Sequence, residues 1–178
     1  PRPENIPDLE TPIIENENED TQPFISQSEI IISGFVFNGN TVFSDNELNA
    51  RLEDFLNKPA SFEDIIEARD IISNVYLSNG YITSGAIIPV DSNIGLNPEA
   101  AVITFEIIEG TIEDIQIISE GRLRNYINAR ARAFSEPVLN QNDIEEGLRL
   151  LQISPLINSI SAEIAPGSAP GRSILIVQ

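Results

Sequence analysis

Cysteine, histidine and methionine are absent from this chain of 178 residues, and lysine occurs only once, at Lys58. Without cysteine the chain has no disulfide and no thiol nucleophile. Without histidine it lacks the commonest general base and metal ligand, and catalytic triads need such a base. We therefore predict no catalytic residue, no metal site and no cofactor. The chain starts at Pro1, and we expect it to be part of a longer protein.

Basic residues and long apolar runs are also scarce. The 28 aspartates and glutamates outnumber the 10 lysines and arginines, which gives a net charge of −18. Phosphate contacts require lysine and arginine, and anionic membrane surfaces attract the same residues. We therefore expect neither a nucleic acid nor an anionic lipid surface as a partner. No apolar run reaches the ~18 residues of a membrane-spanning helix.

Acidic residues and prolines are concentrated at the start of the chain. Residues 1–29 hold eight acidic residues, one arginine and five prolines. A segment this polar cannot bury enough apolar surface to offset the entropy lost on ordering. We predict an acidic, proline-rich linker over residues 1–29, with docking around Phe24-Ile25 as the alternative.

Local signals predict an α+β module over residues 30–110. A strand rich in isoleucine, valine and phenylalanine leads into the turn Asn38-Gly39-Asn40, where glycine and asparagine tolerate positive φ. Two serine–acid pairs at the spacing of a capping box predict helix starts, and they are Ser44 with Glu47 and Ser61 with Asp64. Gly80 has the position of a C-terminal cap.

The remaining strands of this module are predicted from side chains that alternate between the two faces of a strand and from one proline. Pro89 cannot donate to a strand ladder, so the strand that contains it is expected at a sheet edge. The expected elements are strand 30–37, helices 45–56 and 62–77, and strands 81–90 and 101–108.

The same order of elements begins again after Glu109-Gly110, over residues 111–178. Asn140 is a candidate cap for the second helix of this part. The expected elements are strand 111–118, helices 123–134 and 141–151, and strands 157–164 and 173–177. The predicted fold class is α+β, with two tandem β-α-α-β-β modules, each a three-stranded sheet covered by two helices.

The tandem units resemble POTRA domains, and more narrowly those of two-partner secretion transporters of the TpsB, hemolysin-activator type. Four stretches carry the resemblance. The first is Phe37 to Ser44, the second is Tyr76 with Asn79 to Ser84, and the third is Phe105 to Ile112. The fourth consists of Leu150 to Gln152, Pro155, Ala165-Pro166-Gly167 and Gly171-Arg172-Ser173.

This resemblance implies a non-enzymatic, periplasmic region of an outer-membrane transporter. Such a region captures an extended secreted polypeptide by strand addition and delivers it to the β-barrel of the same chain. Two alternatives stay open, which are an outer-membrane protein assembly factor and a structural scaffold that binds a folded partner.

Three sets of residues are candidate sites. An exposed sheet edge lets an unfolded client add a strand, and the alternative is a capped edge without a client. The predicted peptide-binding edge consists of Tyr81, Ile82, Thr83, Ser84, Gly85, Ala86, Ile87 and Ile88. The predicted hinge between the modules is Glu109, Gly110 and Thr111. A basic patch for docking to an acidic surface, or alternatively a solvated helix face, is formed by Arg122, Arg124, Arg130 and Arg132.

Overall fold

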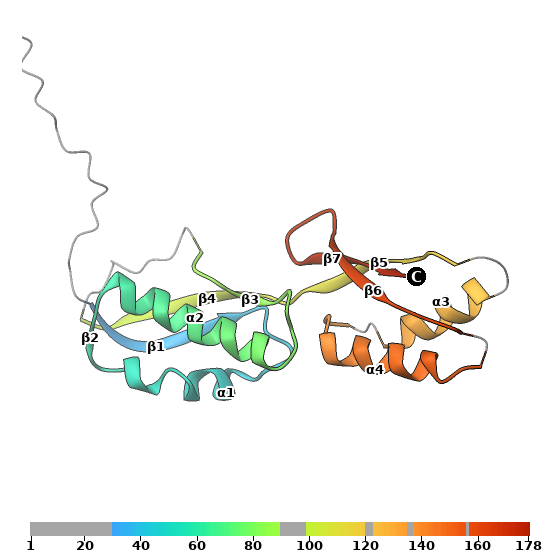
Figure 1. The fold of residues 1–178 in the computed structure, drawn as a ribbon. Coiled ribbons are helices and arrows are strands. Elements are labelled where there is room, and N and C mark those ends of the chain that lie inside the picture. Colours follow the sequence, from blue (N-terminus) through green and yellow to red (C-terminus); the bar gives the residue numbers. More distant parts are fainter. Residues whose placement is uncertain (1–29, 90–98, 120–122, 135–136, 156) are drawn as a thin grey trace, which may run out of the picture.

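The computed structural model describes residues 30–89, 99–119, 123–134, 137–155 and 157–178. Two modules follow one another along the chain, and in each the helices lie together on one side of a β-sheet (Figure 1). The predicted α+β class is therefore confirmed. The predicted linker over residues 1–29 lies outside the described residues.

The first module has a mixed sheet of four strands. They are β1 (Ile30–Asn38), β2 (Pro59–Ala60), β3 (Gly85–Ile87) and β4 (Ala101–Ile108). Their order is β2-β1-β4-β3. The two central strands, β1 and β4, are parallel, and each outer strand is antiparallel to its neighbour. The prediction of three strands is wrong here because the sequence analysis missed β2.

The helices of this module begin where the capping boxes predict and end differently. They are α1 (Asp45–Ala50), the 3-10 helix η1 (Glu53–Phe55) and α2 (Phe62–Ser78). Both predicted capping boxes are present, at Ser44 and at Ser61. The expected single helix over 45–56 is wrong. Asn57 has a φ of 58° and donates its N–H to the Ile32 carbonyl at 2.8 Å, which returns the chain to the sheet as β2.

A compact apolar layer joins the sheet to the helices of this module. The Phe35 and Phe105 rings of the central strands stack with centroids 5.8 Å apart. The helices contribute Leu48, Ile72 and Tyr76, none of which is exposed to solvent. Alternation along β4 directs every second residue into this layer, as its burial pattern confirms. In β1 the alternation is interrupted by an irregularity between Ile32 and Gly34, after which Phe35 and Phe37 again face the layer.

The second module has the predicted sheet of three strands, in the order β5-β7-β6. Its elements are β5 (Thr111–Ile117), α3 (Leu123–Ala133), α4 (Gln141–Gln152), β6 (Ala162–Pro166) and β7 (Arg172–Val177). The cap predicted at Asn140 is present. The expected strand over 157–164 begins too early, because the N–H of Ile157 closes a turn onto Ser154.

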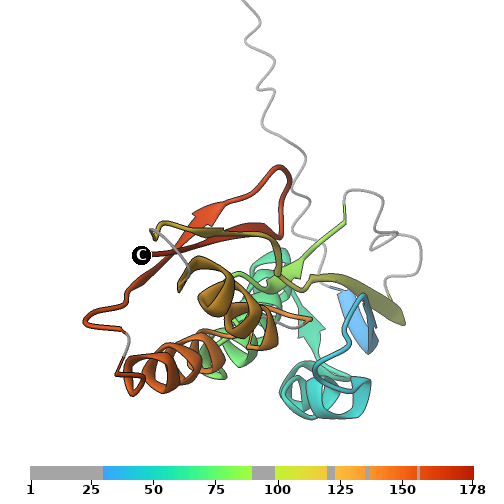
Figure 2. The same ribbon diagram turned by 90° about the vertical axis from the view of Figure 1, so that its right-hand side faces the viewer.

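The modules meet where α2 ends and α4 begins, and the two helices follow each other head to tail (Figures 1 and 2). Gln141 in the first turn of α4 donates its N–H to the Gly80 carbonyl at 2.9 Å. The Asn140 side chain donates to the Asn79 carbonyl at 3.0 Å. Donors at the start of one helix thus meet acceptors just past the end of another, which satisfies groups that helix ends leave unpaired.

Candidate functional site

The predicted edge strand is shorter than expected. The chain from Tyr81 to Ser84 continues the turn that ends α2, with the Tyr81 N–H bonded to the Tyr76 carbonyl and the Ser84 N–H to the Tyr81 carbonyl. These local bonds use the backbone donors that a strand would need. Of the described residues in the strand predicted over 81–90, only Gly85–Ile87 (β3) forms a strand. Val90 lies outside the described residues. The strand order confirms that β3 lies at the sheet edge, as Pro89 predicts.

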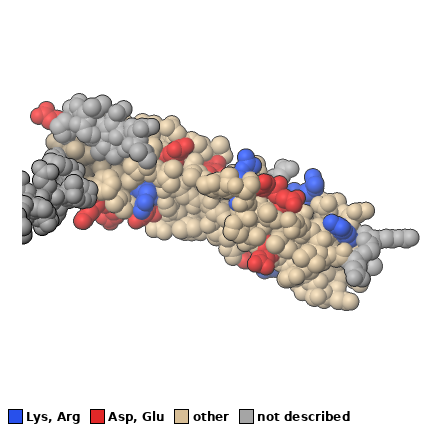
Figure 3. All heavy atoms as spheres, turned by 90° about the horizontal axis from the view of Figure 1, so that it is seen from above, with Lys and Arg blue, Asp and Glu red and all other residues tan. Residues whose placement is uncertain are grey.

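Side chains of the predicted edge divide between the core and the solvent. Ala86 and Ser84 are buried, whereas Ile82 and Ile87 are each 41% exposed. None of the eight residues is charged. The face of the described residues that is seen from above carries scattered charged side chains (Figure 3). An uncharged edge has none of the charges that commonly block strand addition.

One backbone donor of β3 is bonded to the neighbouring helix. The Ala86 N–H donates to the Ser73 hydroxyl of α2 at 3.0 Å, and that hydroxyl donates to the Arg69 carbonyl at 3.0 Å. Because the Ala86 N–H is bonded to α2, it is not part of the hydrogen-bond ladder with β4. In an antiparallel pair, an N–H outside the ladder points to the side of the strand away from its partner. Ser73 therefore occupies the place where an added strand would present a carbonyl.

A cluster of three aromatic rings supports the turn before β3. Phe43, Tyr76 and Tyr81 meet edge to face, and the closest pair, Phe43 and Tyr76, has centroids 4.9 Å apart. Such edge-to-face contacts are favourable beyond the area that they bury. The cluster ties the turn after β1 to the end of α2.

The carboxylate of Glu109 connects this cluster to the end of β4. Its Oε1 accepts the N–H of Thr41 at 2.7 Å, the N–H of Val42 at 2.9 Å and the hydroxyl of Tyr76 at 2.9 Å. The Thr41 hydroxyl donates to the other oxygen. Burial pushes the pKa of Glu109 up, but the hydrogen bonds from these three residues outweigh burial and hold the pKa below its ordinary value. Burial and the Glu109 carboxylate both raise the pKa of Tyr76.

Stability of the first module should fall in acid because of this carboxylate. A group whose pKa is lower in the folded state contributes stability above its ordinary pKa, and the contribution is lost as pH falls through the folded pKa. We expect the difference in unfolding free energy between the wild type and Glu109→Gln to shrink as pH falls from about 5 to about 3. Urea denaturation of both proteins across this range measures it, and a constant difference would contradict the assignment.

The predicted hinge residues are held by hydrogen bonds on both sides. The Gly110 N–H donates to the buried Ser84 hydroxyl at 2.9 Å, and the Gly110 carbonyl accepts from the Leu139 N–H at 2.7 Å. The Thr111 N–H donates to the Gly171 carbonyl at 2.8 Å. The hinge role stays a prediction, and any rotation here would have to break these bonds.

The described arginines of the predicted basic patch lie on α3 and are exposed, whereas Arg122 lies outside the described residues. Successive residues of an α-helix are rotated by ~100° about its axis. Arg124, Arg130 and Arg132 therefore point in three different directions around α3. The Arg130 guanidinium lies over the Tyr126 ring, 5.2 Å from its centroid, and Arg132 donates to the Asn128 side chain at 3.3 Å. Docking of this patch to an acidic surface stays a prediction.

Among the described residues there is no cluster of three acidic side chains that could hold a metal ion. No helix in the described part of the chain is long and apolar enough to cross a membrane.

The sequence analysis missed Ser73 and misjudged Glu109. A serine within the apolar stripe of a helix signals a hydroxyl with a buried partner, but its partner Ala86 is 13 residues away. Glu109 was assigned only to the hinge, although a glutamate directly after an apolar strand signals a carboxylate that has found donors. Tyr76, named in the sequence analysis only for the resemblance, also makes one of these bonds.

Residues 30–110 match the model of the POTRA domain, ShlB-type. Two similar proteins are both named outer membrane transporter CdiB. The one from Dickeya dadantii is 31% identical over 78% of this chain, and the one from Escherichia coli O6:K15:H31 is 25% identical over 81%. The chain spans 24% of the length of each of these relatives.

Solved structures share the fold. CdiB from Escherichia coli superposes with a TM-score of 0.68 at 22% identity, covering 92% of this chain and 29% of that structure. The N-terminal domain of Omp85 from Thermosynechococcus elongatus superposes with a TM-score of 0.65 at 21% identity, covering 84% of this chain and 65% of that structure.

Proposed function

Because residues 30–110 are a POTRA domain of the ShlB type and the chain is related to TpsB-family outer-membrane transporters, we propose that it binds a secreted polypeptide in the periplasm. The region captures an extended segment of this partner by strand addition at β3. It then delivers the segment to the β-barrel of the same transporter. The relatives are transporters, which supports a role without catalysis.

The observation that carries the proposal is that β3 lies at the edge of its sheet, with its outward Ala86 N–H bonded to the Ser73 hydroxyl of α2 and not to another strand. Strand addition needs an edge with unpaired backbone groups and pockets for alternate side chains. β3 ends its sheet and carries no charge. Its exposed Ile87 offers apolar contact to the side chains of an incoming strand.

Binding at this edge requires an exchange of hydrogen bonds at Ala86. The incoming carbonyl would replace the Ser73 hydroxyl as the acceptor of the Ala86 N–H. Ser73 can then keep its bond to the Arg69 carbonyl. Because this bond to the partner replaces an existing one, it adds little net free energy, and affinity is expected to be weak, as suits a receptor that releases its cargo.

Replacing Ser73 by alanine tests this exchange. The variant leaves the Ala86 N–H without its internal acceptor, so a short peptide of alternating valine and threonine should bind about threefold to tenfold more tightly. NMR titration measures the affinity and maps the site by shifts at Gly85 to Ile88. Ser78→Ala is the matched control, because Ser78 lies on the same helix and its hydroxyl bonds only to α2 carbonyls.

Two results would count against the proposal. Shift changes confined to regions away from β3 would place the peptide elsewhere. Equal affinities for the wild type, Ser73→Ala and Ser78→Ala would mean that the Ala86 N–H takes no part in binding.

A second candidate is the POTRA region of an outer-membrane protein assembly factor. The shared fold with the N-terminal domain of Omp85 favours it. The number of POTRA units in the full-length protein separates the two, since two units favour secretion and a longer array favours assembly. A scaffold for a folded partner would predict no secretion defect when β3 is altered.

A further inference from the structure

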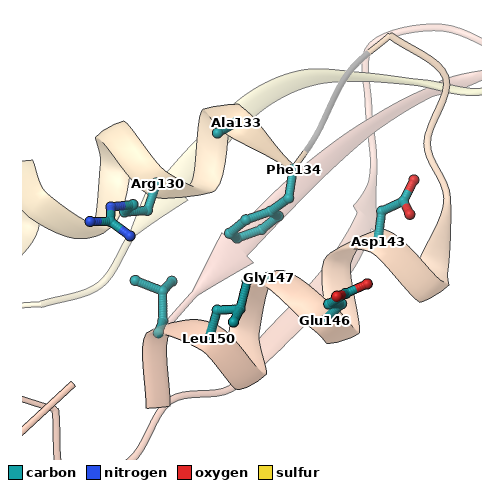
Figure 4. A pocket seen from close by; sticks show the side chains of 8 residues that line it. Arg130, Ala133, Phe134, Asp143, Glu146, Gly147 and Leu150 are labelled. Carbon is teal, nitrogen blue, oxygen red and sulfur yellow. The ribbon is translucent and has the colours of Figure 1, made fainter. Parts of the chain in front are cut away.

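We propose that the groove between α3 and α4 of the second module binds an amphipathic helix of a partner protein, with opposite charges at the two ends of its apolar stripe. The groove encloses a cavity of about 400 Å³. Figure 4 shows its lining, with Arg130 and Phe134 on the α3 side and Asp143, Glu146, Gly147 and Leu150 on α4. The proposal is independent of strand addition at β3.

The floor of the groove is apolar because one glycine lets a ring approach the helix backbone. A Cβ atom at Gly147 would lie 2.2 Å from Cδ1 of Phe134, so only glycine leaves room for the ring there. Leu150 forms the next part of the lining and is 62% exposed. Ile153, one turn further, is 74% exposed and extends the apolar surface beyond α4. Exposed apolar surface that is rimmed by charged residues is typical of sites where a partner binds.

The occupant must satisfy its own backbone hydrogen bonds. The walls of the groove are helices, whose N–H and C=O groups are bonded within each helix except at the ends. An extended peptide would bury its backbone groups here without partners, which is costly. A helix has no such need, and packing an amphipathic helix into an apolar groove is an established mode of recognition. This distinguishes the groove from the β3 edge.

The charges at the two ends specify the occupant further. Arg130 lies at one end and the carboxylate of Asp143 at the other, with Glu146 between them on α4 (Figure 4). All three side chains belong to exposed residues. A partner helix with an acidic residue at one end of its apolar stripe and a basic residue at the other matches both ends. The stretch of α4 from Asp143 to Leu150 is ~10 Å long, or about two helical turns.

The test uses a fluorescent helical peptide about four turns long with one leucine stripe, glutamates in its first turn and lysines in its last. A second peptide has the same composition with prolines that prevent helix formation. Two further helical peptides carry only glutamate or only lysine at both ends. Fluorescence anisotropy measures each affinity, and NMR shifts locate the site.

We expect the mixed-charge helix to bind most tightly and the proline peptide not to bind. Leu150→Glu should weaken binding at least fivefold, because it places a charge in the apolar lining. Arg130→Glu makes both ends acidic, so the all-lysine helix should become the preferred ligand by about twofold to fivefold. Leu77→Glu and Arg124→Glu are the matched controls. Leu77 is an exposed leucine of α2 and Arg124 an exposed arginine of α3, and neither lines the groove.

Several outcomes would overturn the proposal. One is equal binding of all four peptides, and another is insensitivity to both Leu150→Glu and Arg130→Glu. Shifts confined to β3 would assign the peptide to the other site. If the chain sediments as a dimer that Leu150→Glu dissociates, the groove is an interface between copies of this chain.

Discussion

Replacing Glu109 by alanine should lower the unfolding free energy of the first module by about 3 kcal/mol, since buried donors left without an acceptor cost about 1–3 kcal/mol each. The Thr41 N–H is exposed and can bond to water. The Tyr76 hydroxyl belongs to a residue with no exposed surface, and the Val42 N–H is partly buried. Most of the loss should come from these two donors.

Chemical denaturation followed by tyrosine absorbance measures the effect, because Tyr76 and Tyr81 both report on the first module. Glu106→Ala is the matched control. Glu106 lies on β4, three residues before Glu109, and is exposed, so its replacement removes an equal charge without removing these bonds. Glu109→Gln keeps one oxygen acceptor and should lose less than Glu109→Ala. An equal loss in Glu106→Ala and Glu109→Ala would show that charge alone, and no bond network, sets the effect.

Replacing Gly110 by alanine should destabilise the protein by about 2–4 kcal/mol and loosen the contact between the modules. A Cβ atom at Gly110 would lie 2.0 Å from Oγ1 of Thr83 and 2.8 Å from the Thr83 carbonyl oxygen. Rotation of the side chain cannot relieve the contact with a backbone atom. The strand end would have to move, and with it the bonds that Gly110 makes to Ser84 and Leu139.

Two measurements separate these consequences. Denaturation gives the loss of stability, and hydrogen exchange of the Leu139 amide reports the bond between the modules. Gly34→Ala is the matched control, because no atom lies within 4 Å of a Cβ there, and it should leave both quantities nearly unchanged. Unaltered exchange at Leu139 in Gly110→Ala would contradict the expected loosening.

Local signals in the sequence predicted the starts of the helices and the tight turns. Ser44 and Ser61 cap α1 and α2 as expected, since a capping box is completed within four residues. Gly39 and Gly80 both have positive φ, which the turn and the helix C-terminus require. These features depend on neighbours in the sequence, so the sequence displays them directly.

Features that depend on distant partners could not be predicted. β2 exists because Asn57 reaches Ile32, and the short β3 reflects how the end of α2 uses the donors of Tyr81 and Ser84. Neither contact leaves a periodic signal. The sequence therefore predicted the order of the longer elements but not β2, and the extent of the edge strand also needed the structure.

In the candidate site, too, local features could be predicted from the sequence and features that depend on distant partners could not. The edge position of β3 followed from Pro89 alone, because proline restricts where a strand can lie. The hydroxyl of Ser73 could not be placed against Ala86, since the pairing depends on how α2 lies over the sheet. The groove between α3 and α4 also escaped notice, because Phe134 and Gly147 meet only after both helices pack.

The head-to-tail contact of α2 and α4 has a mechanical consequence. If a polypeptide bound at β3 is drawn toward the second module, as proposed, the force between the modules would pass through these helix ends as well as through the covalent chain. The bonds from Gln141 to Gly80, from Asn140 to Asn79 and from Leu139 to Gly110 would share that force. The resistance of the two modules to bending relative to one another would then depend on a few polar contacts at their junction.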